Sequence, residues 1–437
     1  MAELQEGSKR DRTGVELFAG AGGLAMAVHR AGFRPLLFNE FAKRACETLE
    51  ANVAVRVPAG ERPTVPGPGE RVPLVAGDVQ ELDMRYLAGR VDVLAGGPPC
   101  QPFSLGGVAR GDEDKRNMFP QMFRAVRQIR PKAVICENVR GLLRPSFKPY
   151  FDYIMRELEL PFEERAKGAT WQQHDAYLLE RLKREPDDPT ERYDIVMMPV
   201  NAADYGVPQI RNRVIIVAFR RDLKVDLARF RRLVQPTHSE TALMRSMADG
   251  GYWERHSDVP NHVRERVMAR LPATLPMDDG LRPWHTLRDA IAGIGDNKPL
   301  PEVPDEWLDR TEHLLGGFTE HIGWPGARIY DGHTPNELDR PAKTVKAGVH
   351  GVPGGESVML LDELVADRDA PDGVRYKHRY MTVRETARVM TFPDSWILEG
   401  PRGEKMRQLG NAVPVALGEV FARAVSSVLD EAEECKK

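Results

Sequence analysis

The sequence predicts an α/β protein with a second, less regular lobe. Short apolar runs typical of buried strands alternate with helix-like segments from about residue 14 to residue 219, and this alternation stops at Arg220. Several of the predicted strands end in glycine or in an acidic residue, at the edge where open α/β sheets bind ligands. With 437 residues, the chain can form two lobes or one large domain with an insertion.

Composition narrows the class of protein only slightly. Hydrophobic residues make up 41% and charged residues 29%, as in ordinary globular proteins, and the net charge of −3 neither indicates nor excludes a local nucleic-acid-binding face. No apolar run approaches membrane-spanning length, and residues 1–12 are too polar for a signal peptide. The four cysteines lack paired CxxC spacing, which argues against a zinc site or a disulfide framework and for a reducing compartment; they are Cys46, Cys100, Cys136 and Cys435.

The first strand–helix unit contains a glycine-rich turn. A strand over 14–18 leads into Ala19-Gly20-Ala21-Gly22-Gly23, which opens a helix over 24–30 that ends near Gly32. Such a turn lets the backbone approach a ligand closely and leaves amide donors at the helix start. Many α/β proteins have a glycine turn without a cofactor, so the turn alone leaves both interpretations open.

Acidic residues follow the next two strands. The strand over 35–38 ends in Asn39-Glu40, before a helix over 41–51, and the strand over 73–78 ends in Asp78. An acid at the end of the second strand can accept hydrogen bonds from ribose hydroxyls, although a surface carboxylate that caps the next helix would fit as well. Three strand ends of this kind in one series favour a ligand site.

The central feature is the turn from Gly96 to Ser104. It follows the apolar run over 91–94, and its consecutive prolines, Pro98 and Pro99, prevent it from continuing as helix or sheet. The turn therefore presents the thiol of Cys100 at the carboxyl end of a strand, unless Cys100 is an inert residue of a plain loop. The polar loop over 106–117 is long enough to close over a site, and a helix is expected over 118–130.

Three charged side chains follow on later strands. The strand over 133–136 ends in Glu137, which places a carboxylate one strand away from Cys100 and favours function over a surface role. After a charged, helix-prone insertion over 161–192 and a strand over 195–200, Arg211 and Arg213 precede a strongly apolar strand over 214–219. At this spacing the two arginines should serve one face, either to grip an anion or polar ring or as a solvated pair.

The remainder is expected to be an irregular, partly β lobe over 220–340. Its many arginines could follow a phosphate backbone or form a solvated face, and the sequence leaves both possibilities open. A turn-rich connection over 339–355 and an amphipathic helix over 383–391 follow. Residues 410–414 then open a closing helix over 415–429.

These segments resemble the motifs of the DNA (cytosine-5) methyltransferases, which use S-adenosylmethionine (AdoMet). Eight motifs occur in family order over nearly the whole chain: Phe18-Ala-Gly20-Ala-Gly22-Gly23, Asn39-Glu40, Asp78, Gly97-Pro98-Pro99-Cys100-Gln101-Pro102-Phe103-Ser104, Glu137-Asn138-Val139, Gln209-Ile-Arg211-Asn-Arg213, Arg340-Pro341-Ala-Lys-Thr344-Val345 and Gly410-Asn411-Ala412-Val413-Pro414. The resemblance implies a Rossmann-like, mostly parallel AdoMet-binding sheet with an antiparallel strand near 214–219. It also implies a smaller irregular or β-rich target-recognition domain over 220–376, a hinge over 377–403, and a catalytic domain over 12–219 that is completed by 404–437.

The resemblance also implies roles for single residues. Cys100 would be the nucleophile and Glu137 would hold the cytosine ring, while Arg213 and Arg211 would contact the base carbonyl and nearby backbone. AdoMet, which leaves as S-adenosylhomocysteine, would be bound by Phe18, Gly20, Gly22, Gly23, Glu40, Asp78, Pro98, Asn411, Ala412 and Val413. DNA would be contacted by Gln101, Ser104 and Thr344, and no metal is expected.

The expected partner is double-stranded DNA, methylated at C5 of a flipped-out cytosine in a specific sequence, in a bacterial restriction-modification system. We expect a cytoplasmic monomer with no membrane partner, and a cognate restriction endonuclease that would act independently. A tRNA cytosine methyltransferase of the same family is the main alternative, and the length of the 220–340 lobe favours DNA. An amino-methyltransferase is disfavoured because Cys100 stands where those enzymes need an aromatic residue. The presence of both Cys100 and Glu137 argues against an inactive DNA-binding regulator, and the absence of a histidine motif beside Cys100 argues against a thiol hydrolase.

Overall fold

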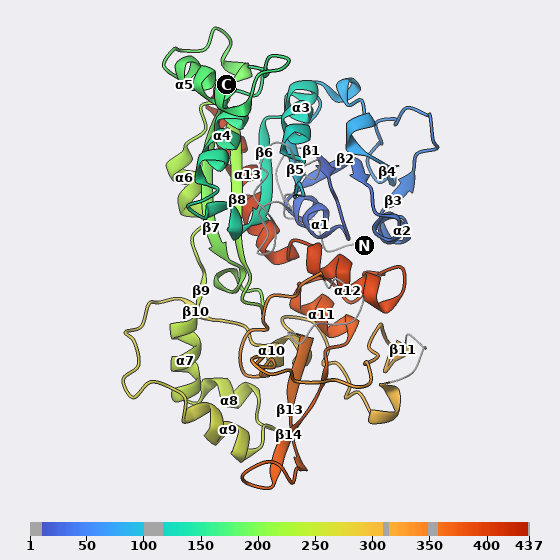
Figure 1. Ribbon diagram of the computed structural model, residues 1–437, viewed down its shortest axis with the longest axis vertical. Coiled ribbons are helices and arrows are strands. Elements are labelled where there is room, and N and C mark those ends of the chain that lie inside the picture. The colour runs from blue at the N-terminus through green and yellow to red at the C-terminus, as the bar shows by residue number, and fades with distance from the viewer. Residues whose placement is uncertain (1–10, 100–116, 309–313, 348–356, 436–437) are drawn as a thin grey trace. The chain divides into compact units, whose positions relative to one another are not determined.

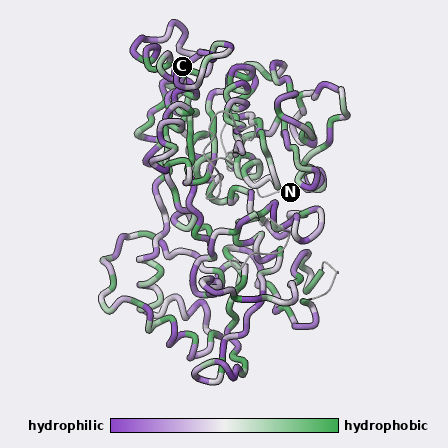
Figure 2. Tube along the Cα trace, viewed as in Figure 1, coloured by the Kyte–Doolittle hydropathy of each residue, from purple (hydrophilic) through white to green (hydrophobic). Residues whose placement is uncertain are grey.

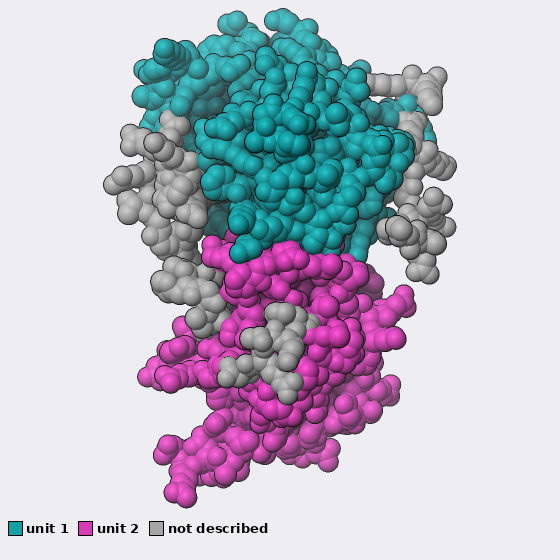
Figure 3. Space-filling model, turned by 90° about the vertical axis from the view of Figure 1, so that its right-hand side faces the viewer, with its two compact units in different colours: residues 1–200, 212–235, 418–437 teal, residues 201–211, 236–417 magenta. Residues whose placement is uncertain are grey.

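The computed structural model describes residues 11–99, 117–308, 314–347 and 357–435. The chain divides into two compact units (Figure 3). Unit 1 comprises residues 1–200, 212–235 and 418–437, and unit 2 comprises residues 201–211 and 236–417. The last helix therefore returns to the unit that contains the first strand, so unit 1 is discontinuous in sequence.

Unit 1 is built on an eight-stranded sheet with the order β3-β4-β2-β1-β5-β6-β8-β7 (Figure 1). Neighbouring strands from β3 to β6 are parallel, and β8 runs antiparallel to β6, which confirms the expected antiparallel strand. The strands are β1 (Arg12–Leu17), β2 (Phe33–Glu40), β3 (Ala54–Arg56), β4 (Val72–Ala76), β5 (Val93–Gly96), β6 (Ala133–Val139), β7 (Tyr193–Asn201) and β8 (Asn212–Arg220).

The order in which strands are added to the sheet reverses between β1 and β5, which are parallel to each other. The chain builds outward from β1 through β2 to β4 and β3, and then returns to place β5 on the other side of β1. Ligands bind at such a switch point, outside the carboxyl ends of the strands. The two strands lie close together here, because a Cβ on Gly96 would come within 2.8 Å of the carbonyl oxygen of Leu17. The glycine turn after β1 and the Pro-Pro turn after β5 therefore leave the sheet side by side.

Helices cover both faces of this sheet. In one hydrophobic core, side chains of the strands pack against α3 (Phe119–Ile129) and α4 (Lys148–Glu159). In a second core, other strand side chains pack against α1 (Gly23–Arg30) and α2 (Lys43–Asn52). Adjacent strand residues alternate between the cores: Leu74 belongs to the second core and Val75 packs against the first. The central strands are accordingly mostly hydrophobic (Figure 2), although β1 also contains Arg12, Thr13 and Glu16.

The insertion over 161–192 contains the helix α5 (Trp171–Leu182). A capping box formed by Thr170 and Gln173 fixes its start. The buried His174 accepts or donates a hydrogen bond with the Tyr153 hydroxyl of α4 at 3.0 Å, and Arg156 of α4 forms an ion pair with Asp175. The insertion is thus an ordered helix that packs on α4.

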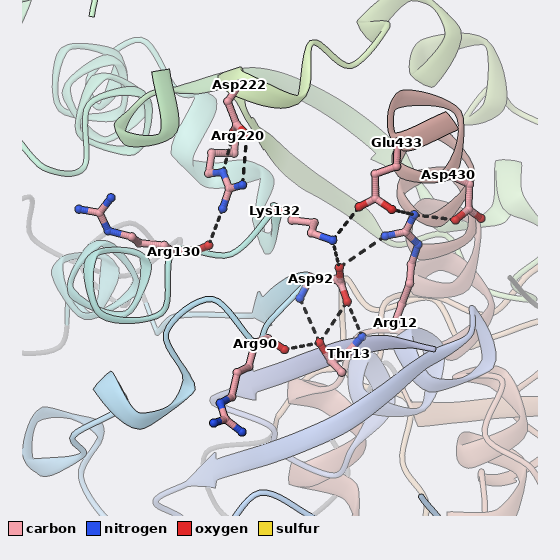
Figure 4. A network of polar contacts seen from close by, with 10 residues as sticks. All are labelled: Arg12, Thr13, Arg90, Asp92, Arg130, Lys132, Arg220, Asp222, Asp430 and Glu433. Carbon is pink, nitrogen blue, oxygen red and sulfur yellow. Dashed lines mark hydrogen bonds and ion pairs between the residues drawn. The ribbon is translucent and has the colours of Figure 1, made fainter. Parts of the chain in front are cut away.

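The closing helix α13 (Val415–Glu434) is tied to the start of the sheet by an ion network (Figure 4). The almost fully buried Arg12 of β1 contacts Asp92, Asp430 and Glu433, and Lys132 bridges Asp92 and Glu433. By length and composition the segment Arg402–Glu434 could cross a membrane, but 72% of its most apolar window is buried within the protein. Most of this apolar surface is therefore used for internal packing.

Unit 2 contains the small sheets expected of an irregular, partly β lobe, and it also contains helices that were not predicted. Between residues 236 and 340 the described strands are only two residues long, whereas four helices occur. Scattered aromatic and arginine residues gave no helical period in this region. The longest strands form the hairpin of β13 (Val358–Ala366) and β14 (Val374–Tyr380). The other elements of this lobe are α7 (Glu240–Ala248), α8 (Gly251–Arg255), α9 (Asn261–Met268), α10 (Leu287–Ala292), α11 (Val383–Val389), α12 (Arg402–Asn411), β9 (His238–Ser239), β10 (Arg282–Pro283), β11 (Leu314–Leu315) and β12 (Phe318–Thr319), while α6 (Leu227–Leu233) belongs to unit 1.

The helix expected to be amphipathic over 383–391 is instead buried on all sides. In α11 even Arg384, Glu385 and Arg388 are shielded from solvent. Each is satisfied internally; Glu385, for example, forms a bidentate ion pair with Arg379. These pairs explain how so many charges fit inside unit 2.

Candidate active site

The glycine turn after β1 adopts a strained, open conformation. Phe18 has a φ of 57°, which is rare for a residue with a side chain, and Gly20 and Gly22 also have positive φ values. Backbone strain of this kind is concentrated at ligand sites. Among the described residues, a Cβ at Gly20 would meet only the Phe18 carbonyl oxygen within 4 Å, so these residues leave the space above the turn open. α1 begins at Gly23, with Gly22 at its N-cap.

Backbone amides hold the Glu40 carboxylate at the end of β2. One oxygen accepts from the Gly20 N–H at 2.7 Å, and the other accepts from Phe41 and Ala42 at 2.8 and 2.7 Å. Glu40 therefore links the glycine turn to the second strand. The next residue, Phe41, is a large apolar side chain that is 77% exposed. At the end of β4, Asp78 accepts from the Gln80 N–H and remains partly exposed.

Glu16 is a buried carboxyl group directly below this turn. It lies in β1 between Phe38 of β2 and Ala95 of β5, and its Oε2 makes no hydrogen bond with the described residues. Burial raises the pKa of Glu16 well above its ordinary value, and the negative charge of Glu40 raises it further. A buried carboxyl oxygen that accepts no hydrogen bond from the described residues is costly, so its position beside the ligand edge suggests a role there.

Two hydrogen bonds fix the described part of the turn after β5, at Pro98 and Pro99. The Pro98 carbonyl accepts from the Asn138 side chain at 3.0 Å, and the Pro99 carbonyl accepts from the Met118 N–H at 3.1 Å. The residues on either side of the 100–116 segment are thus joined directly. Cys100, Gln101, Ser104 and most of the 106–117 loop lie outside the described residues.

Glu137 and Arg213 face each other across β6 and β8. Glu137 pairs with Ile215 in the antiparallel register, so Arg213, two residues earlier, lies on the same face. Arg213 Nε lies 2.6 Å from Glu137 Oε1, and both side chains are about nine-tenths buried. This ion pair lacks hydrogen-bond geometry, because Oε1 accepts no hydrogen bond from the described residues. A Cβ at Gly97 would lie 3.6 Å from Glu137 Oε2, which places the carboxylate beside the Pro-Pro turn.

Arg211 does not share this face. It precedes β8, so the alternation of a strand does not apply to it, and it belongs to unit 2, where its guanidinium is buried. There it donates to the carbonyl oxygens of Val345, Gly410 and Ala412. The Thr344 hydroxyl donates to the Ile210 carbonyl at 2.8 Å. In the same unit, Ala412 and Val413 are buried and Asn411 is exposed.

No local sequence pattern singles out Glu16, Phe41 or Asn138 as a site residue. In the sequence Glu16 is one polar position in an apolar strand, and its burial depends on tertiary packing. Phe41 read as the first residue of a helix. Asn138 was noted only as part of a motif, although its side chain anchors Pro98.

Solved structures with this fold are methyltransferases. A putative DNA modification methyltransferase encoded within an E. coli prophage is 18% identical, with a TM-score of 0.56 over 96% of this chain and 100% of that one. The S. pombe Dnmt2 methyltransferase is 15% identical, with a TM-score of 0.50 over 97% of this chain and 99% of its own. Because the sequence identities are this low, the structural similarity shows only a shared fold, the α/β methyltransferase fold.

Sequence comparison identifies the family. The family model for C-5 cytosine-specific DNA methylases matches residues 13–160 and 189–427, and the gap between them contains α5. The chain belongs to this family and is a DNA (cytosine-5) methyltransferase. The Type II methyltransferase M.Eco47II of E. coli is 31% identical over 96% of this chain and 80% of its own length, and M.PspPI of Psychrobacter is 29% identical over the same shares.

Proposed function

We propose that this enzyme methylates C5 of a cytosine in a specific duplex DNA sequence through a covalent bond between Cys100 and C6 of the ring. Cytosine C5 is a poor nucleophile, so direct transfer would be slow. Addition of the Cys100 thiolate to C6 makes C5 electron-rich, which divides one difficult step into two easier ones. After C5 has taken the methyl group, loss of its proton and elimination of the Cys100 thiolate release 5-methylcytosine.

The observation that carries the proposal is the position of Glu137. Its buried carboxylate lies beside the turn that leads into Cys100, and Oε1 has no donor among the described residues. We infer that Glu137 holds N3 and the exocyclic amine of cytosine and favours protonation at N3 as the ring accepts electrons. Arg213, already paired with Glu137, would contact the base carbonyl. The target base must leave the duplex to reach these groups, at a cost of a few kcal/mol.

The residues at the switch point fit AdoMet. When bound, AdoMet supplies a methyl group activated by its sulfonium sulfur. The open turn at Gly20, Gly22 and Gly23 would admit the cofactor, and Glu40, fixed by three amides, would accept from the ribose hydroxyls. Asp78 would face the adenine amine, and Phe18 and the exposed Phe41 would contact the adenosine. Pro98 would line this pocket, with Asn411, Ala412 and Val413 at the methionine end.

The biological setting is proposed from the relatives. M.Eco47II and M.PspPI are named Type II methyltransferases. We infer that this enzyme protects bacterial DNA from a cognate restriction endonuclease, and that it acts in the cytoplasm as a monomer. Gln101, Ser104 and Thr344 are the proposed DNA contacts, and no metal takes part.

A mechanism-based trap tests this proposal. DNA fragments amplified with 5-fluorocytosine in place of cytosine contain every sequence context and have no proton to lose at C5. With AdoMet, the wild-type enzyme should form a stable DNA adduct that peptide mass spectrometry places on Cys100, and Cys100→Ser should form none. Methylation of ordinary DNA without any adduct on fluorinated DNA would overturn the covalent mechanism. Labelled AdoMet offered with duplex DNA and with tRNA separates the two substrates, since label found only in tRNA would overturn the proposed substrate.

A further inference from the structure

The Arg211 guanidinium is surrounded by backbone carbonyls. Arg211 is 1% exposed; Nη1 donates to the Val345 carbonyl at 2.8 Å, and Nη2 donates to those of Gly410 and Ala412 at 2.7 and 2.9 Å. All of these residues belong to unit 2. A buried guanidinium with these acceptors has little capacity left for a nucleotide base.

Two of these carbonyls belong to the end of α12. The last carbonyls of a helix lack partners within it, and the helix dipole favours a cation there. Arg211 satisfies the carbonyls on both sides of Asn411, whose side chain remains exposed. The guanidinium therefore fixes the backbone and leaves the Asn411 side chain available.

Contacts of the neighbouring residues hold the backbone of Arg211 in place. Residues 208–211 pair with residues 342–345 through the Ile210 and Ala342 N–H groups, and the Gln209 side chain accepts from the Val345 N–H at 3.1 Å. Gly410 packs directly on the backbone of Lys346 and Ala347, because a Cβ there would overlap both residues. Three segments that are distant in sequence are thus held together around one guanidinium.

We propose that Arg211 is a positioning residue for the cofactor: it fixes the 410–413 backbone so that Asn411 and its neighbours can bind the methionine end of AdoMet. This inference rests on the proposed function, which assigns 410–413 to the cofactor. It replaces the base contact that the resemblance implied for Arg211 with an action through the backbone of α12. Arg213 keeps its role at the base, so the two arginines of one motif serve different ligands.

Calorimetric titration of S-adenosylhomocysteine into the full-length enzyme without DNA separates these roles. Arg211→Met should weaken binding about tenfold, because three carbonyls lose a charged donor. Arg211→Lys, which keeps the charge but not the fork, should recover part of the loss. Arg213→Met should bind the ligand like the wild type. In turnover assays, Arg211→Lys should raise KM for AdoMet more than it lowers kcat.

Arg384→Met is the matched control for lost stability. Arg384 is also buried in unit 2 and also donates to three carbonyls, those of Thr319, Pro393 and Trp396. Its loss should lower the melting temperature comparably and leave the affinity of the folded protein unchanged. Partial unfolding reduces the number of binding sites in the titration, whereas a displaced 410–413 backbone weakens each site.

The possible results separate this inference from the proposed function. Wild-type affinity in both Arg211 variants, or equal weakening in Arg384→Met, would overturn the positioning role. No binding of S-adenosylhomocysteine by the wild-type enzyme would instead overturn the proposed cofactor.

Discussion

Glu137 and Arg213 form a buried ion pair across the antiparallel strands β6 and β8, with 2.6 Å between Oε1 and Nε. The pair lacks hydrogen-bond geometry, so Arg213 orients the carboxylate by charge, and Oε1 accepts no hydrogen bond from the described residues. This arrangement suits a group that must hold a ring during a change in its electron density. It also predicts that loss of the pair lowers the rate of methyl transfer and leaves the affinity for the cofactor unchanged.

Glu137→Gln should lower kcat about 100-fold or more, because the amide cannot stabilise a proton at N3 as the carboxylate does. The affinity for S-adenosylhomocysteine should stay within about twofold of the wild type, since the proposed role of Glu137 is at the base and not at the cofactor. Single-turnover methylation and calorimetric titration provide the two readouts. A tenfold loss of cofactor affinity with little change in turnover would contradict the assigned role.

Glu16→Gln should change how stability depends on pH. The folded protein raises the pKa of Glu16 above its ordinary value of 4.5, so the folded state holds this proton more tightly than the unfolded chain does. The stabilising contribution is complete below about pH 4.5 and is lost as pH rises through the folded pKa. Glutamine does not titrate, so the variant should gain stability relative to wild type as pH rises toward neutral. Urea unfolding at several pH values provides the measurement, and parallel stability curves would count against it.

Gly96→Ala should destabilise unit 1 by about 1–3 kcal/mol, because the new methyl group would press on the Leu17 carbonyl where β1 meets β5. Gly77→Ala is the control, since a Cβ there would meet no atom of the described residues within 4 Å. Urea denaturation should show a lower midpoint for the first variant and little change for the second. Equal effects would mean that the close approach of β1 and β5 is unimportant.

Arg12→Met should lower the free energy of unfolding by about 3 kcal/mol, because it leaves acidic groups of α13 without their buried cation. Lys148→Met removes an exposed ion pair within α4 and should cost less than about 0.5 kcal/mol. The comparison tests whether the network in Figure 4 holds the closing helix in unit 1. Similar losses in the two variants would refute that role.

Much of the sheet could be predicted from the sequence, because its strands are apolar runs that end in glycine or acidic residues. The three-residue strand β3 was missed, since so short a segment shows no period. The helices α7 to α10 of unit 2 were missed because their apolar residues are spread among arginines, whereas α11 was predicted. Side-chain partners were harder still: Arg211 and Arg213 are two residues apart, yet only Arg213 lies in β8. The burial of Glu16 likewise depends on tertiary packing that no local pattern reveals.

The chemical position of the methyl group tests the central claim most directly. DNA from bacteria that express the wild-type enzyme or Cys100→Ser can be digested to nucleosides and analysed by mass spectrometry, with tRNA from the same cells in parallel. We predict 5-methyl-2′-deoxycytidine in DNA with the wild-type enzyme and none above background with Cys100→Ser, although the variant still binds S-adenosylhomocysteine. A methyl group on an exocyclic nitrogen, 5-methylcytosine found only in tRNA, or undiminished methylation by Cys100→Ser would contradict the account.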